Sequence, residues 1–326
     1  MTRGAFFSGV EHRPSGANQT GGALHNQRLV LTLLRRRALG LKVGRRSVEL
    51  ASVDLAGGIV ARRGRDWPVP TPDALVRFLD QAVPEILSAT PGAPPPCGTG
   101  IAMPYEIWAW DDYARHAPRA EWEALDLVRR IEAQTGAPAH LRNDMTCAAR
   151  GELAWGTRRA AGDWIYLYIG ALPGGGVVLD GRVRDGRLGN AGALGPLPVR
   201  GGAGGQVQLL DIASLLRFEQ MAGRDLAGYD WALDDPVFET WLGQTVKALA
   251  QAVTAACAVL DFELLVIDGL FPDHVRELLV DRVRAAMAEQ DLRGLIVPEV
   301  AAGSVGADAR VLGAATVALE AEFFLS

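Results

Sequence analysis

The amino-acid sequence predicts an α/β protein with two lobes and a cleft between them. At 326 residues the chain is longer than one hydrophobic core usually serves. Two segments far apart in the chain, residues 41–63 and 163–183, repeat one scheme of short β-rich runs separated by glycine turns. Elsewhere, helical and strand-like segments alternate, which favours the α/β class over α+β.

The composition is that of a globular protein. Hydrophobic residues make up 49% and charged residues 22% of the chain, which excludes disordered and fibrous classes. No run approaches the roughly 18 apolar residues of a membrane-spanning helix, and the N-terminus lacks the apolar core of a secretory signal. We therefore expect a cytoplasmic protein with no membrane partner.

The three cysteines predict neither disulfides nor a cysteine-rich metal site. Cys97, Cys147 and Cys257 lie far apart and form no Cys-x-x-Cys pair. We expect each to be a small buried side chain.

Charge is distributed unevenly along the chain. Residues 1–46 hold nine Lys or Arg residues and only one acidic residue, whereas the remainder holds 24 basic and 37 acidic residues. Such a basic arm predicts weak, non-specific binding to DNA phosphates. The alternative is a solvated tail that touches the acidic body.

The first segments are an arm and a helix. Residues 1–23 are rich in Gly, Ser and Asn without an apolar period, which predicts a mobile arm. From Leu24, apolar residues follow helical spacing until Gly40 offers a stop.

The remaining elements follow from turns, caps and periodicity. The first repeated unit predicts three antiparallel strands with turns at residues 44–46 and 56–58; the second places turns at residues 171–175 and 180–181. The helix that begins near Asn143 starts at a polar cap. We further expect helices at residues 72–88, 121–135, 143–155, 209–221, 236–260, 273–289 and from 307, and strands at 99–104, 264–270 and 295–300.

Five fragments carry a resemblance to a known family. They are RNDMTCAARGE at 142–152, PGGGVVLDGRV at 173–183, GRLGNAGALGPLPV at 186–199, VIDGLF at 266–271 and GADARVLGAATVAL at 306–319. In this order and spacing the sequence resembles the ROK family of repressors, open reading frames and kinases. The resemblance implies a two-lobed actin/hexokinase-like (ribonuclease H-like) ATPase-type fold with a central cleft. Lobe 1 would comprise residues 41–142, joined by the C-terminal helix 306–326, and lobe 2 residues 143–305.

The N-terminal helix carries a second resemblance. HNQRLVLTLLRRRALG at 25–40 is similar to the opening helix of the winged helix-turn-helix in ROK repressors. The chain then passes into the first strand without a recognition helix or wing, which groove reading requires. We therefore interpret residues 1–40 as a basic arm and a remnant of a helix-turn-helix, and expect no recognition of a particular operator.

The resemblance also assigns a sugar site. Asp144, in the pair Asn143-Asp144, matches the catalytic aspartate of ROK kinases, and its alternative role is to cap a helix. Tyr105, Trp108 and Trp110 could offer a sugar an aromatic platform, or belong to the core. The glycines have a second explanation, since tight turns also select glycine. The residues expected to bind a sugar are Asn143, Asp144, Gly174, Gly175, Gly176 and Asn190.

The nucleotide-binding and zinc-binding elements of the family are altered. Where ROK kinases resemble Asp-x-Gly-Gly-Thr, residues 42–47 read KVGRRS, and the second phosphate turn reads GALP at 170–173. The Glu-x-Gly-His element becomes ALGP at 193–196, and residues 200–211 hold no cysteine for the structural zinc of the family. We expect no nucleotide cofactor and no metal.

These features favour a protein like the sugar-responsive ROK transcriptional regulators. It would form a homodimer and bind a sugar or sugar derivative without phosphorylating it. One alternative is an ATP-dependent sugar kinase that uses Asp144 as base. The other is an interaction subunit that pairs with a full-length ROK regulator.

Overall fold

The computed structural model describes residues 36–89, 91–108, 117–157, 162–202 and 204–323. The expected arm, most of the expected N-terminal helix, and Trp110 lie outside these ranges. In the described part of the chain, no helix has both the length and the apolarity needed to cross a bilayer.

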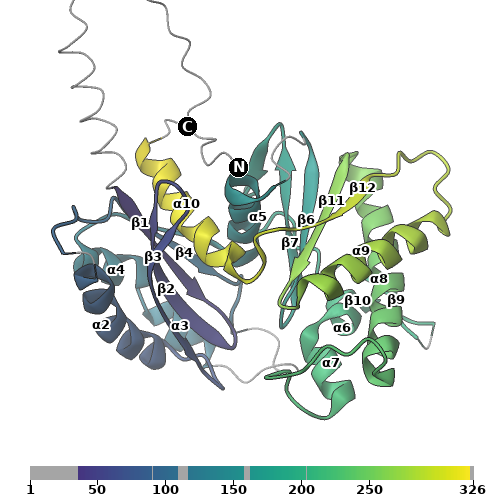
Figure 1. The fold of residues 1–326 in the computed structure, drawn as a ribbon, viewed down its shortest axis with the longest axis horizontal. Helices are drawn as coiled ribbons and strands as arrows, with labels where there is room; N and C mark the ends of the chain where they lie inside the picture. The colour runs from purple at the N-terminus through teal and green to yellow at the C-terminus, as the bar shows by residue number, and fades with distance from the viewer. Residues whose placement is uncertain (1–35, 90, 109–116, 158–161, 203, 324–326) are drawn as a thin grey trace, which may run out of the picture.

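Two five-stranded sheets form the centre of the two lobes (Figure 1). In each sheet, three consecutive antiparallel strands are followed by two parallel ones, so the predicted repeat and α/β class are confirmed. The first sheet has the order β3-β2-β1-β4-β5, with β1 Arg37–Val43, β2 Ser47–Asp54, β3 Ile59–Asp66, β4 Thr99–Met103 and β5 Ala139–Asn143. The second has the order β12-β11-β6-β7-β8, with β6 Trp164–Ile169, β7 Pro173–Leu179, β8 Arg182–Arg184, β11 Leu264–Gly269 and β12 Glu299–Ala302.

Helices cover the outer and inner faces of the sheets (Figure 1). A short hairpin, β9 Pro198–Arg200 and β10 Gln206–Gln208, precedes α6. The outer helices of lobe 1 are α2 Pro72–Ser88, α3 Arg119–Ala124 and α4 Leu127–Thr135; those of lobe 2 are α6 Leu210–Ala213, α7 Leu215–Ala222, α8 Pro236–Leu260 and α9 Asp273–Ala288. Two inner helices, α5 Asp144–Trp155 and α10 Ala309–Phe323, lie between the sheets, with α10 preceded by the 3-10 turn η1 Gly306–Asp308.

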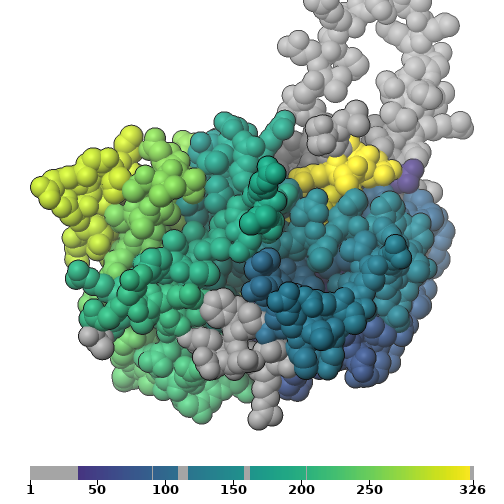
Figure 2. All heavy atoms as spheres, turned by 180° about the vertical axis from the view of Figure 1, so that it is seen from behind, coloured from purple at the N-terminus to yellow at the C-terminus, as the bar shows by residue number. Residues whose placement is uncertain are grey.

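The inner helices join the lobes. Ala148 and Ala149 of α5 pack on the aromatic side chains of β6, whereas Val311 and Ala315 of α10 pack on β1 and β2. From behind, α10 lies along the junction of the two lobes (Figure 2).

Four local expectations are corrected by the structure. Residues 37–40 are strand in β1 rather than the end of a helix, because β1 pairs with both β2 and β4. The last strand runs over Glu299–Ala302 instead of 295–300, following Pro298, which has no amide to donate. The helix expected at 209–221 is interrupted at Ser214, and that at 121–135 is two helices, separated by the extended Leu125.

Glycines let α10 approach its neighbours at backbone distance. A Cβ atom on Gly100 of β4 would lie 1.7 Å from the carbonyl oxygen of Ala314, and one on Gly313 would lie 1.6 Å from that of Cys147 in α5. Both neighbours are backbone atoms, so no side chain can rotate away. The position of α10 therefore depends on residues without a side chain at these contacts.

We expect Gly100→Ala to lower the free energy of unfolding by about 3 kcal/mol, because the added methyl overlaps backbone that cannot yield cheaply. Urea denaturation measures the change. The matched control is Gly243→Ala in α8, where the added Cβ meets nothing within 4 Å. That variant should gain up to about 1 kcal/mol from helix propensity. Equal stability of Gly100→Ala and wild type would contradict the packing argument.

Candidate functional site

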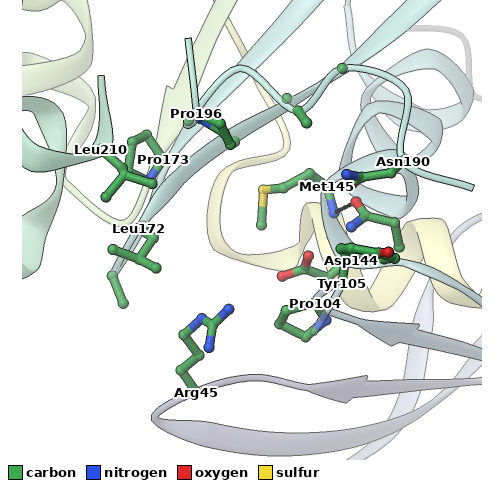
Figure 3. Close-up of a pocket in the computed structure, with 18 of the residues that line it drawn as sticks. Arg45, Pro104, Tyr105, Asp144, Met145, Leu172, Pro173, Asn190, Pro196 and Leu210 are labelled. Atoms are coloured by element: carbon green, nitrogen blue, oxygen red, sulfur yellow. Dashed lines mark hydrogen bonds between the residues drawn. The ribbon is translucent and has the colours of Figure 1, made fainter. Parts of the chain in front are cut away.

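A cavity of about 290 Å³ lies in the cleft between the lobes. Its walls come from the β1–β2 turn, the segment after β4, the start of α5, the β6–β7 turn and the loop at 190–196. Figure 3 shows Arg45 pointing into it from the β1–β2 turn, between Leu172 on one side and Pro104 on the other. Five of the six predicted sugar-binding residues line it: Asn143, Asp144, Gly174, Gly175 and Asn190.

Asn143 and Asp144 lie where β5 passes into α5. The Asn143 side-chain oxygen accepts hydrogen bonds from the backbone amides of Met145 (2.9 Å) and Thr146 (3.1 Å), so it caps the helix. The side-chain NH₂ group of Asn143 can donate a hydrogen bond to a ligand. The sequence assigned the capping alternative to Asp144, but Asn143 performs it.

Asp144 is buried at the floor of the cleft, with 5% of its surface exposed. Burial raises the pKa of its carboxyl group, and the charges of Arg310 and Arg45 partly oppose this. A carboxyl group in this setting can hydrogen-bond a hydroxyl group or accept its proton.

Arg310 is a cleft residue that the sequence analysis missed. It is 9% exposed, its Nη1 lies 3.9 Å from Asp144 Oδ2, and its guanidinium lies 5.2 Å from the ring centre of Tyr168. Burial raises the pKa of the Tyr168 hydroxyl to about 12, so this side chain stays neutral. Arg310 stands inside the family-like fragment at 306–319, but only the fold brings it to Asp144.

The glycines of the second unit belong to strand β7, so their explanation as turn residues is wrong. A Cβ on Gly174 would lie 2.6 Å from Met145 Cγ, and one on Gly176 would lie 2.5 Å from Ala149 Cβ. These glycines therefore allow α5 to lie directly on β7. Gly176 is absent from the cavity lining, so its predicted contact with a sugar receives no support from its position.

Three cationic side chains lie at the end of β1 and in the β1–β2 turn. Lys42 is buried, donates to Ser47 Oγ (2.9 Å) and lies 3.6 Å from Glu49. Burial, and secondly the charge of Arg310, lower the Lys42 pKa to about 8. Arg45 lines the cavity and donates to the carbonyl oxygen of Ile107 (2.8 Å).

Arg46 joins the two lobes across the cleft. Its two terminal nitrogens donate to the two carboxylate oxygens of Glu219 in α7, each at 2.5 Å. The Glu219 side chain is 11% exposed and that of Arg46 is 48% exposed, so solvent partly screens this bidentate pair.

The β6–β7 turn presents an apolar wall. Its members Leu172 and Pro173 line the cavity together with Pro196 and Leu210. The carbonyl oxygens of Gly170 and Ala171 accept hydrogen bonds from the amides that begin α7. These interactions hold the turn against α7.

Other predicted features lie at the edge of the cavity or beyond it. Tyr105 lines the cavity and is 54% exposed, whereas Trp108 lines an adjoining hollow of about 860 Å³ beneath Arg119. Ala193 and Pro196 bring neither a carboxylate nor an imidazole to the wall. Among the described residues, no cluster of three or more His, Cys, Asp or Glu side chains could hold a metal ion.

Two sheets of this topology with a cleft between them define the actin-like, two-lobed class that includes sugar kinases. The sequence profile of the ROK family matches residues 38–321. The chain therefore belongs to the ROK family.

Relatives within the family include both kinases and regulators. The bifunctional enzyme NanE/NanK of Brucella melitensis is 33% identical over 205 residues, which is 59% of this chain but only 37% of that longer protein. A Streptomyces griseus ROK glucokinase in complex with glucose and AMPPNP superposes with a TM-score of 0.64 at 24% identity, covering 87% of this chain and 99% of the glucokinase. A ROK transcriptional regulator homologous to the E. coli MLC protein superposes with a TM-score of 0.66 at 22% identity, covering 88% of this chain and 78% of the regulator.

Lys42 makes the stability of the fold depend on pH. The pKa of Lys42 is lowered to about 8 in the folded protein, so the folded state binds fewer protons at this side chain than the unfolded state does. Below pH 8 the buried side chain is charged, and this charge then lowers the free energy of unfolding most. We expect Lys42→Met to be more stable than wild type by up to about 3 kcal/mol at pH 7, and this advantage to fall to about half by pH 9.5. Arg62 stays 2.9 Å from Glu49 in the variant, so that carboxylate keeps a partner. Urea denaturation of both proteins over this range tests it, and a difference that does not change with pH would contradict the prediction.

Proposed function

We propose that this ROK protein is a sensor related to the transcriptional regulators of the family. It binds a monosaccharide or a derivative in the cleft, does not transfer phosphate, and acts as a homodimer. Both regulators and kinases are among its relatives, so the proposal depends on the chemistry of the cleft.

The cross-cleft pair of Arg46 and Glu219 is the observation that carries the proposal. Phosphoryl transfer needs a cradle for nucleotide phosphates and for Mg²⁺, which takes oxygen ligands. Here the β1–β2 turn carries Arg45, which lines the cavity, and Arg46, and neither side chain offers the oxygen ligand that Mg²⁺ takes. Arg46 is already bound bidentately to Glu219, which supports a closed cleft held without a nucleotide.

The position of Asp144 favours the kinase as the second candidate. It lies at the cleft floor with a raised pKa, as a general base near a sugar hydroxyl would. The same carboxyl group equally supports recognition of that hydroxyl. The sensor and the kinase are therefore distinguished by whether magnesium-ATP binds and phosphorylates the sugar.

We expect a thermal-shift screen of monosaccharides and their derivatives to yield a stabilising ligand, and magnesium-ATP to give no shift. A ligand at a hundredfold excess over its dissociation constant contributes about 2.7 kcal/mol. Asp144→Asn should abolish the ligand's shift, whereas Asp234→Asn on the exposed surface should retain it. Magnesium-dependent phosphorylation of a sugar that Asp144→Asn eliminates would establish the kinase. Failure of every sugar derivative to bind would favour the interaction subunit.

Weak, non-specific DNA binding stays a prediction for the basic segment up to Arg46, most of which lies outside the described residues. Its positive charge should displace counterions, so affinity should fall steeply with salt. Titration against the promoter of its own gene and a scrambled duplex at near-physiological salt measures the preference. A preference above about a thousandfold, the lower end for specific binders, would contradict the prediction.

A further inference from the structure

We propose that the cleft ligand is a sugar acid, whose carboxylate binds Arg310 and Arg45 while a neighbouring hydroxyl group binds Asp144. This inference names the ligand class for the binding site of the proposed function and rests on that function.

Arg310 is a buried cation whose hydrogen bonding is incomplete. Its side chain lines the cavity with 9% exposure and interacts with the Tyr168 hydroxyl. Its buried Nε atom has no hydrogen-bond partner among the residues that the structure describes. The nearest carboxylate oxygen, Asp144 Oδ2, is 3.9 Å away, beyond hydrogen-bond distance. A buried guanidinium is costly unless an anion and hydrogen-bond acceptors compensate it. The cavity therefore presents a site for an anionic acceptor.

Arg45 places a second guanidinium at the same cavity from the β1–β2 turn, whereas Arg310 comes from α10. It is close enough to act electrostatically on Asp144, as Arg310 also does. Planar guanidinium groups bind carboxylates with directional, charge-assisted hydrogen bonds. An acid bound between Arg45 and Arg310 would also join the β1–β2 turn to the start of α10.

Asp144 supplies the complementary feature beside the cations. A carboxyl group next to a guanidinium matches a ligand with a hydroxyl group next to a carboxylate. Aldonic acids carry this pair on adjacent carbons, and uronic acids in the pyranose form place the nearest hydroxyl group one carbon further from the carboxylate. A neutral hexose offers hydroxyl groups alone and leaves the charge of Arg310 without a new counterion.

Charge and size favour a carboxylate over a phosphate. A carboxylate brings a single negative charge to the cavity, whereas a phosphate monoester brings about −1.5 to −2. Glu106 also lines the cavity and would repel the additional charge, although its side chain is partly exposed and screened. At about 290 Å³ the cavity is at the small end of ligand pockets, which suits one sugar unit.

The apolar wall suits the remainder of such a ligand. Leu172, Pro173, Pro196 and Leu210 face the cavity from lobe 2 and offer no hydrogen bonds from their side chains. The C–H groups of a sugar acid can pack against this wall while its polar groups meet the arginines and Asp144.

Calorimetric titration of the full chain at 0.15 M salt tests the class with D-gluconate, D-glucuronate, D-galacturonate, D-glucose and glucose 6-phosphate. We expect at least one acid to bind at least tenfold more tightly than both the neutral sugar and the phosphate. Arg310→Met should weaken this binding by at least about thirtyfold, the loss typical when one partner of a buried charge pair is removed. Arg182→Met removes an exposed arginine of β8 and should leave the affinity unchanged.

Arg45→Met tests the same carboxylate from the β1–β2 turn rather than from inside a helix, in case Arg310→Met fails to fold. It should also weaken the acid more than it weakens the neutral sugar. Tighter binding of glucose than of any acid would overturn this inference while leaving sugar sensing intact. Tighter binding of glucose 6-phosphate would overturn the carboxylate assignment. No binding by any of the five compounds, or an affinity for the acid that neither arginine variant changes, would overturn the inference.

Discussion

The backbone-distance packing of α10 is the constraint on which the cleft depends. At Gly100 and Gly313 an added methyl would collide with backbone oxygens of α10 and α5, and at Gly151 with that of Ala309. These contacts fix the starts of the two inner helices relative to one another. Asp144 is the first residue of α5 and Arg310 the second of α10, so the same packing sets their 3.9 Å separation.

Buried carboxylates fix the segment that leads into α10. Glu152 accepts hydrogen bonds from the amides of Ser304 and Val305, and Asp268 accepts from the amide of Gly306. Asp268 also receives the Tyr166 hydroxyl and pairs with Arg276. Because a buried carboxylate left without these partners would be costly, each one specifies the path of the chain. The start of α10 is thus held by carboxylates of α5 and β11 in lobe 2.

The floor of the cleft has the backbone turns and strands of the family's fold but carries cationic and aliphatic side chains. The turns and strands of the family's fold remain, whereas the side chains they present are guanidinium, ammonium and aliphatic groups. Buried cations need compensation, and the structure provides it in different ways. Arg46, which is 48% exposed, has Glu219. Of the buried cations, Lys42 has Ser47 and Glu49, and Arg310 has an aromatic face and a distant carboxylate. Arg310 therefore has the least compensation for its charge from the protein, and a ligand can contribute most there.

Local sequence patterns were enough to predict the class of the fold, most elements, and the pair Asn143-Asp144 at the start of a helix. Turn residues, caps and hydrophobic periodicity are local, so they could be read without coordinates. Contacts between groups that are distant in the chain could be seen in the tertiary structure alone. Arg46 lies 173 residues from Glu219 in the sequence, and Arg310 reaches Asp144 from a different helix. The tertiary structure also shows that the glycines of β7 serve helix packing rather than a turn. The residues that require glycine there belong to α5, which is not adjacent to β7 in the sequence.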